Sequence, residues 1–372
     1  ILFYVKNGEP FHLRQIRDPA GVGIRALDRS RFQVALELPT AFFLDLCALP
    51  TLAAVPRRFI ETHGDRWLTA VPLPVSGAYQ LETWRINDRI RLRQNPHYWD
   101  AANIGCALVD LLPCTNPNTA LNLYETGAAD IVWDKNLVPS ELLDLLLTRP
   151  DFHAYPVLST YFLRYNVTRK PFADPRIRRA FGMVIDRQRL VRRVTRGGER
   201  PSSAITPPLM EGYTPPSGLE FDPPAARRLL AEAGFADGKG FPPIQYLFDT
   251  TTKLQEQIAV ELQEMWRREL GIAVGLRKLE WKTYLVAQRE LDYDVCRSSW
   301  IGDYSDPNTF LDLFLSNNGN NRTGWKNAHY DQLLRQANAE LDPARRGALL
   351  HQTERLLVAE EAPIVPLFHY TG

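Results

Sequence analysis

Along the second half of the chain, segments with the two-residue hydrophobic period of a strand alternate with segments that have the 3.6-residue period of a helix. Residues 161–167, YFLRYNV, alternate apolar and polar side chains as a strand does. A helix is predicted directly after it, over 173–194, with Asp174 as its cap and Pro175 in its first turn. Gly197-Gly198 is expected to end this helix. Its predicted buried stripe consists of Ile177, Phe181, Val184 and Val191.

The same alternation continues to the end of the chain. Further helices are predicted over 224–235, 253–271, 281–291, 307–315, 329–341 and 343–361. Strands are predicted over 244–248, 272–280, 293–300 and 363–370. Helices that alternate with strands indicate an α/β architecture from about residue 160 onward.

The first part of the chain is richer in hairpins. Two short strands are predicted within 22–38, and a hairpin over 77–95 turns at Asn87-Asp88. Residues 107–113 are typical of a buried strand. The segment 55–67 has helical character, and Gly64 is expected to stop the helix within it. A second helix is predicted over 119–127 and ends at Gly127, and a third is predicted over 139–147 with Ser140 as its N-cap.

Composition sets few limits on function. The chain has 372 residues, enough for two or three domains, and its formal net charge of +1 favours neither nucleic acid nor an anionic membrane. None of its apolar runs approaches the ~20 residues of a membrane-spanning helix. The first residues also lack the pattern of a signal peptide, and the chain begins with Ile, so we expect it to be processed or part of something longer.

The cysteines and histidines do not indicate a metal or redox site. A strand between Cys106 and Cys114 would hold them too far apart for a disulfide, and no spacing typical of zinc ligands occurs. We therefore expect free and mostly buried thiols at Cys47, Cys106, Cys114 and Cys296. The segment GVGIRA (21–26) fits a dinucleotide-binding pattern on paper, but a strand-like hairpin follows it where a helix is required. No cofactor is expected.

Two aspartates in WIGDYSDPNTFLDLFL (300–315) are the best candidates for chemistry. Asp306 precedes Pro307 and an apolar helix, so we interpret it as a helix cap. Asp303 lies where a strand runs into a loop, the place where α/β sheets bind ligands, between the aromatic Trp300 and Tyr304. From spacing alone it is either a surface charge or an anchor for a cation. A capping Asp306 would leave no carboxylate pair for a hydrolase.

Four long segments, 77–100, 116–131, 161–194 and 280–334, resemble the family 5 extracellular solute-binding proteins, the oligopeptide and dipeptide receptors of ABC importers. The resemblance covers essentially the whole chain. It implies an α/β fold of the type II periplasmic-binding-protein kind, with two lobes of mixed sheets plus part of an extra subdomain. It also implies that both ends of the family's usual length are missing here, which puts closure over a ligand in question.

The resemblance also implies the ligand site. Asp303, in the W-x-x-D-Y motif, corresponds to the aspartate that pairs with a peptide's α-amino group, and Arg297 to an arginine that meets a carboxylate. Trp281 and Trp300 resemble aromatic residues that line side-chain pockets. Backbone contact with ligand is implied at Tyr161 and Phe162, and Gln255 stands where some oligopeptide receptors have a histidine.

The implied lobes divide the chain into four parts. Residues 1–75 would end the extra subdomain, 76–160 would form the middle of lobe I, 161–350 lobe II, and 351–372 the last helix and strand leading back to lobe I. Such a receptor is not an enzyme. It would bind peptides, meet the membrane subunits of its importer, and lie in the periplasm or lipid-anchored outside the membrane. Alternatives are a nickel chelate, haem or oligosaccharide ligand within the same family, or a glycoside hydrolase.

Overall fold

The computed structural model describes residues 2–372, which form two compact units. The first contains the residues up to Leu46 together with Pro150–Gly372, and the second is Cys47–Arg149. The boundaries at 75/76, 160/161 and 350/351 expected from the resemblance stay a prediction. No helix among the described residues is both long and apolar enough to cross a membrane.

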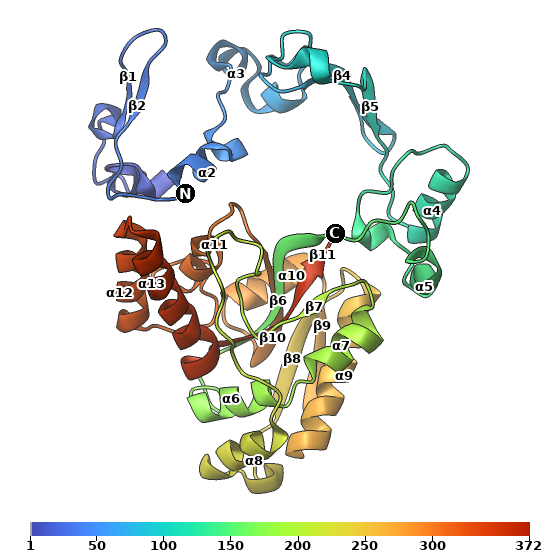
Figure 1. Ribbon diagram of the computed structural model, residues 1–372, viewed down its shortest axis with the longest axis vertical. Helices are drawn as coiled ribbons and strands as arrows, with labels where there is room; N and C mark the ends of the chain where they lie inside the picture. Colours follow the sequence, from blue (N-terminus) through green and yellow to red (C-terminus); the bar gives the residue numbers. More distant parts are fainter. Residues whose placement is uncertain (1) are drawn as a thin grey trace. The chain divides into compact units, whose positions relative to one another are not determined.

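A six-stranded mixed sheet forms the centre of the first unit (Figure 1). Its order is β7-β11-β6-β10-β8-β9. Strand β10 runs parallel to β8 and antiparallel to β6, so β6 is paired on both sides, by β10 and β11. The strands are β6 (Pro156–Tyr165), β7 (Arg200–Pro201), β8 (Ile244–Asp249), β9 (Val274–Leu279), β10 (Val295–Ile301) and β11 (Ile364–Thr371).

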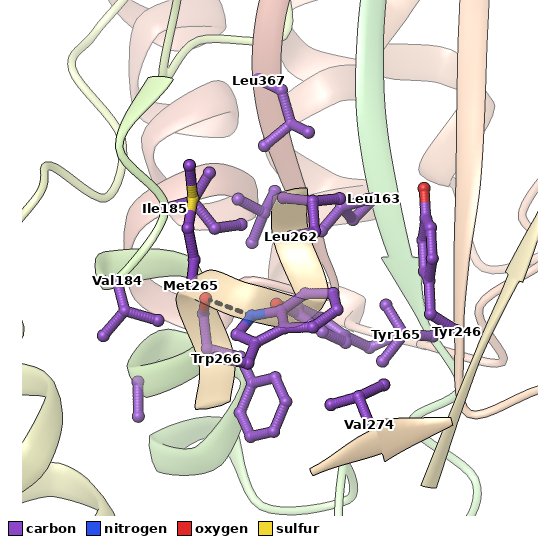
Figure 2. Packing of buried hydrophobic residues seen from close by; sticks show 14 of the residues in the cluster. Leu163, Tyr165, Val184, Ile185, Tyr246, Leu262, Met265, Trp266, Val274 and Leu367 are labelled. Atoms are coloured by element: carbon purple, nitrogen blue, oxygen red, sulfur yellow. Dashed lines mark hydrogen bonds between the residues drawn. The ribbon is translucent and has the colours of Figure 1, made fainter. Parts of the chain in front are cut away.

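One face of this sheet packs against α6 (Pro175–Met183), α7 (Arg187–Leu190), α8 (Pro223–Glu232) and α9 (Lys253–Leu270). Trp266 of α9 is fully buried there, and its indole N–H donates to the carbonyl of Phe181 at 3.2 Å (Figure 2). At Gly182 a Cβ atom would lie 2.9 Å from Val365 of β11, so the absence of a side chain lets α6 lie directly on the sheet.

The opposite face is covered by α10 (Trp281–Arg289), α11 (Asn308–Leu311), α12 (Ala328–Ala339) and α13 (Pro343–Arg355). Strand alternation divides β6 between the two faces. Tyr161, Leu163 and Tyr165 point into the α9 side, whereas Phe162 packs with α11 to α13. Helices on both faces of a mixed sheet confirm the predicted α/β class.

The start of the chain contributes α1 (Gly8–His12), a hairpin of β1 (Ile24–Ala26) and β2 (Phe32–Val34), and α2 (Phe43–Cys47). Phe42 connects this segment to the rest of the first unit. Its ring stacks on that of Tyr304 with 5.1 Å between the ring centroids, and the Arg346 guanidinium lies 5.6 Å from the Phe42 ring centroid. The predicted short hairpin within 22–38 is confirmed.

The second unit has a smaller sheet, β3-β4-β5, formed by Tyr79–Arg85, Arg89–Gln94 and Leu108–Leu111. The predicted turn at Asn87-Asp88 joins its first two strands. Helices α3 (Arg57–His63), α4 (Pro117–Glu125) and α5 (Leu143–Leu146) complete it. Several large apolar side chains are exposed in this unit, among them Trp99 (85%) and Trp133 (83%).

Four local predictions are wrong. The helix expected over 173–194 breaks after Met183, because Asp186 caps a new helix by accepting from the Arg189 N–H. The helical turns that follow end at Arg196, whose backbone is left-handed, and not at Gly197-Gly198. Strand β5 is largely exposed. Ser140 does not cap α5, since its hydroxyl donates to Glu141. The cysteines are free, but of the four only Cys296 is buried.

Candidate functional site

The residues singled out by the sequence gather at the carboxyl ends of β8 and β10. These parallel neighbours end at Asp249 and at Ile301, and the loop after β10 carries Asp303. Ligand crevices in α/β sheets open at this edge. Along β10, Arg297 and Trp300 differ in position by an odd number of residues, so their side chains leave the strand on opposite faces.

The face of Arg297 holds a buried ion pair. Arg297 Nη1 lies 3.2 Å from Asp249 Oδ2, and the side chains are 9% and 0% exposed. The guanidinium also lies over the Tyr161 ring, 5.3 Å from its centroid. Asp249 thus neutralises the charge of Arg297 within the fold, and the contact of Arg297 with a ligand carboxylate that the resemblance implies stays a prediction.

Tyr161 and Gln255 meet on the same face. The Tyr161 hydroxyl donates to Gln255 Oε1 at 3.1 Å and lies 3.2 Å from the hydroxyl of Tyr246. Burial raises the pKa of Tyr161 far above its usual value, so this hydroxyl stays a donor. Phe162 is fully buried on the other face. Its backbone and that of Tyr161 lie in β6, which pairs with β10 on one side and β11 on the other, and the expected backbone contact with ligand stays a prediction.

A cavity of about 210 Å³ lies on the face of Trp300. It brings together Trp300 and Trp281, two of the expected pocket residues; Trp281 is 41% exposed, so the cavity reaches the surface. The Trp281 ring stacks on Tyr284 at 5.6 Å, and the hydroxyl of Tyr284 donates to the Arg297 carbonyl. The lining residues are Arg164, Trp281, Tyr284, Leu285, Gln288, Arg297, Ser298, Ser299, Trp300, Asn320 and Arg322.

Asp303 is exposed at the end of β10. Its backbone N–H donates to Thr309 Oγ1 at 2.9 Å, but its carboxylate has no hydrogen bond or ion pair to any residue in 2–372. Tyr304 does not enclose it as the sequence suggested, because that ring is buried under Phe42. The structure therefore leaves this carboxylate open to solvent.

Asp306 is fully occupied within the fold. Its Oδ1 accepts from the Asn308 N–H at 2.9 Å at the start of α11, which confirms the predicted cap. Both oxygens also accept from Arg346 at 2.8 Å, a bidentate pair that the sequence did not reveal. Asp303 and Asp306 are thus not an equivalent pair of free carboxylates.

Several residues of this site had no signal of their own in the sequence. Asp249 directly follows the predicted strand 244–248 and belongs to no motif. Arg164 and Arg322, which line the cavity, lay in a strand and a loop without a motif. The arginine within the apolar run YFLRYNV was the one available hint, since a buried strand position seldom holds a charge. Among residues 2–372, no group of three or more His, Cys, Asp or Glu side chains is arranged to hold a metal ion.

Comparison with known proteins identifies the family. The sequence model of the family described as bacterial extracellular solute-binding proteins, family 5 Middle, matches residues 3–322. A probable deoxycholate-binding periplasmic protein of Escherichia coli (strain K12) is 34% identical over 361 residues, which are 95% of this chain and 66% of that protein. The periplasmic oligopeptide-binding protein OppA of Salmonella typhimurium is 33% identical over 360 residues, 94% of this chain and 65% of that one. The chain spans slightly less than two thirds of these relatives.

A solved structure agrees in fold. The periplasmic oligopeptide-binding protein of Borrelia burgdorferi superposes with a TM-score of 0.85 at 31% identity, covering 99% of this chain and 73% of that one. This confirms the predicted solute-binding-protein fold. The chain belongs to family 5 of the bacterial extracellular solute-binding proteins.

Proposed function

We propose that this chain is part of the substrate-binding component of an ABC importer and binds peptides in a cleft between two lobes. The observation that carries the proposal is the free carboxylate of Asp303 at the end of β10. A receptor for many peptides has to hold what all peptides share, and the α-ammonium is one such group. A carboxylate that has no partner among residues 2–372 is able to form that ion pair without breaking another within this part of the chain.

The surroundings of Asp303 support an anchoring role. Asp306, three residues on, is held by Asn308 and Arg346, so it does not compete for the ammonium. Burial, together with the negative charge of Asp303, raises the pKa of Asp312 to about 7. A bound ammonium would stabilise both carboxylates in their charged forms.

We propose that Arg297 supports the site from within the fold. Its charge is balanced by Asp249, and only its Nε is buried without a partner. We assign it to holding the floor of the site, with Tyr161 and Gln255. Trp281 and Trp300 are proposed to line a side-chain pocket, where water adapts to different residues at little cost.

The remaining expectations belong to the whole protein. We propose a place in the periplasm, or at the outer face of the cell membrane through a lipid anchor, and contact with the membrane subunits of an importer. The relatives named above are periplasmic by their names. No catalytic role is proposed.

Mass spectrometry of small molecules released on denaturation tests the function. We expect a ladder of short peptides from the purified chain, and none from Asp303→Asn. Peptides retained in the variant would remove Asp303 as the anchor. A single non-peptide compound retained in the variant, for instance a steroid acid, a nickel chelate, haem or an oligosaccharide, would overturn the peptide assignment.

The glycoside hydrolase alternative rests on one observation. Asp312 has a raised pKa, as a general acid does, and its charge interacts with that of Asp303. Turnover of a chromogenic glycoside, abolished by Asp303→Asn and by Asp312→Asn, would establish it. We expect no turnover, because the chain belongs to a family of binding proteins.

A further inference from the structure

The cavity beside Trp300 has an excess of positive charge. Three arginines and no Asp or Glu are among its lining residues. Arg297 contributes little to this excess, since its side chain lies on the other face of β10 and pairs with Asp249. The charges of Arg164 and Arg322 remain.

Arg164 is a buried cation held only by neutral groups. It is 3% exposed. Its Nε donates to Ser298 Oγ at 3.0 Å and its Nη1 to the Asn320 carbonyl at 2.8 Å, while the guanidinium lies 5.1 Å from the Phe162 ring centroid. It forms no ion pair with any carboxylate in residues 2–372. A buried charge without a counter-charge is costly, so a site of this kind gains from an anion.

Two further donors of the cavity lining are buried without a hydrogen-bond partner. Arg322 gives its Nη1 to Gln288 Oε1 at 2.9 Å, but its Nε is buried without a partner, as is the indole Nε1 of Trp300. Arg322 likewise lacks an ion pair within the described chain. Burial lowers the pKa of Arg164, and the positive charge of Arg322, which lines the same cavity, acts in the same direction.

We propose that this cavity selects peptides with an acidic side chain, Asp or Glu, whose carboxylate binds between the guanidinium groups of Arg164 and Arg322. A carboxylate offers acceptors only, which suits a cavity where the lining side-chain atoms that are buried without a partner are donors. Trp281 and Trp300 would contact the methylene groups of the same side chain. An amide would bring donors toward donors, and a lysine would add a third positive charge. This inference rests on the proposed peptide-binding function and names its substrate class.

Isothermal titration with matched tripeptides tests the selectivity. Glu, Gln or Lys is placed at each position in turn in an otherwise all-Ala tripeptide, so that Glu and Gln differ in charge but hardly in shape. We expect the Glu peptide to bind at least about tenfold more tightly than the Gln peptide at one position, as charge-assisted hydrogen bonds imply, and the Lys peptide to bind most weakly. Higher salt should narrow the difference.

Two variants connect the preference to the arginines. Arg164→Met and Arg322→Met should each reduce the Glu-to-Gln ratio to about twofold or less while the Gln peptide keeps its affinity. If Arg164→Met does not fold because Arg164 is buried, Arg322→Met still tests the proposal, since Arg322 is only partly buried. Arg345→Met is the control, because it removes the same charge from an exposed site and should leave the ratio unchanged.

The possible failures are distinguishable. Equal affinity for Glu and Gln peptides, or a preference for Lys, would overturn the acidic selectivity and leave the peptide function standing. A Glu preference that survives both arginine variants would place the selectivity elsewhere. If none of the tripeptides binds, and longer peptides also fail, the proposed function itself is refuted.

Discussion

Each face of the central sheet near Trp300 holds a buried arginine, but only one of the two arginines is paired with a carboxylate. On one face Arg297 is paired with Asp249, 3.2 Å away, and both side chains are inaccessible. On the other face Arg164 is equally buried but has only hydroxyl and carbonyl partners. Where the protein itself neutralises a buried cation, removing the counter-charge destabilises the fold. A buried cation left to neutral groups is available for a ligand's charge.

The largest effect should come from removing the internal counter-charge. Asp249→Asn keeps the acceptor for the Thr251 N–H but leaves Arg297 buried without its anion. We expect the free energy of unfolding to fall by about 3–5 kcal/mol in urea titrations. Glu264→Gln, which breaks the exposed pair with Arg267, is the matched control and should cost less than about 1 kcal/mol. Equal losses in the two variants would remove the distinction between the faces.

A pH experiment examines a third buried group, on the Arg164 face. His369 lies 2.8 Å from Thr160 Oγ1, and since that hydroxyl donates to the Ile205 carbonyl, the imidazole Nδ1–H is the donor. Burial, together with the charge of Arg200, lowers the pKa of His369 to about 4 from its usual 6.5.

The unfolded chain therefore binds more protons than the folded one between these two pH values, so stability is full above pH 6.5 and falls as the pH drops toward 4. His369→Asn keeps a donor and should flatten this loss in thermal melts across the window. Burial raises the pKa of Glu354 to about 7, which acts in the opposite direction, so the measurement is the difference between the wild type and the variant. An unchanged slope would show that His369 is not kept neutral.

Removing the unpaired arginine should matter much less to the fold. We expect Arg164→Met to change the free energy of unfolding by no more than about 1 kcal/mol, because the lost hydrogen bonds are offset by relief of an uncompensated buried charge. Denaturant titration alongside Asp249→Asn measures the contrast directly. A loss as large as that of Asp249→Asn would mean that Arg164 is a structural residue.

The smallest effect on stability is expected at Asp303. Its carboxylate is exposed and unbonded within residues 2–372, so Asp303→Asn should change stability by less than about 0.5 kcal/mol. Loss of bound peptide without loss of stability is the signature of a ligand anchor. A clear destabilisation would instead give Asp303 a role in the loop after β10.

The sequence by itself determined the order of most elements and named several residues of the proposed site. Alternation and helical spacing located the strands of the large sheet except β7, and the Asp306-Pro307 pair predicted the helix that follows it. The long motifs pointed to the family, and through it to Asp303, Trp281 and Trp300. The break at Asp186 was missed because a capping residue inside an apolar period is hard to tell from an exposed position.

Only the tertiary structure decided which charges meet. Asp249 and Arg297 are neighbours because β8 and β10 lie side by side in parallel, a pairing that local patterns do not encode. Arg164 and Arg322 line one cavity because a strand and a distant loop converge on the same face of the sheet. Periodicity tells which residues share a face. The register between strands tells whether a charge on that face finds a partner, and that distinction separates the structural arginine from those proposed to bind ligand.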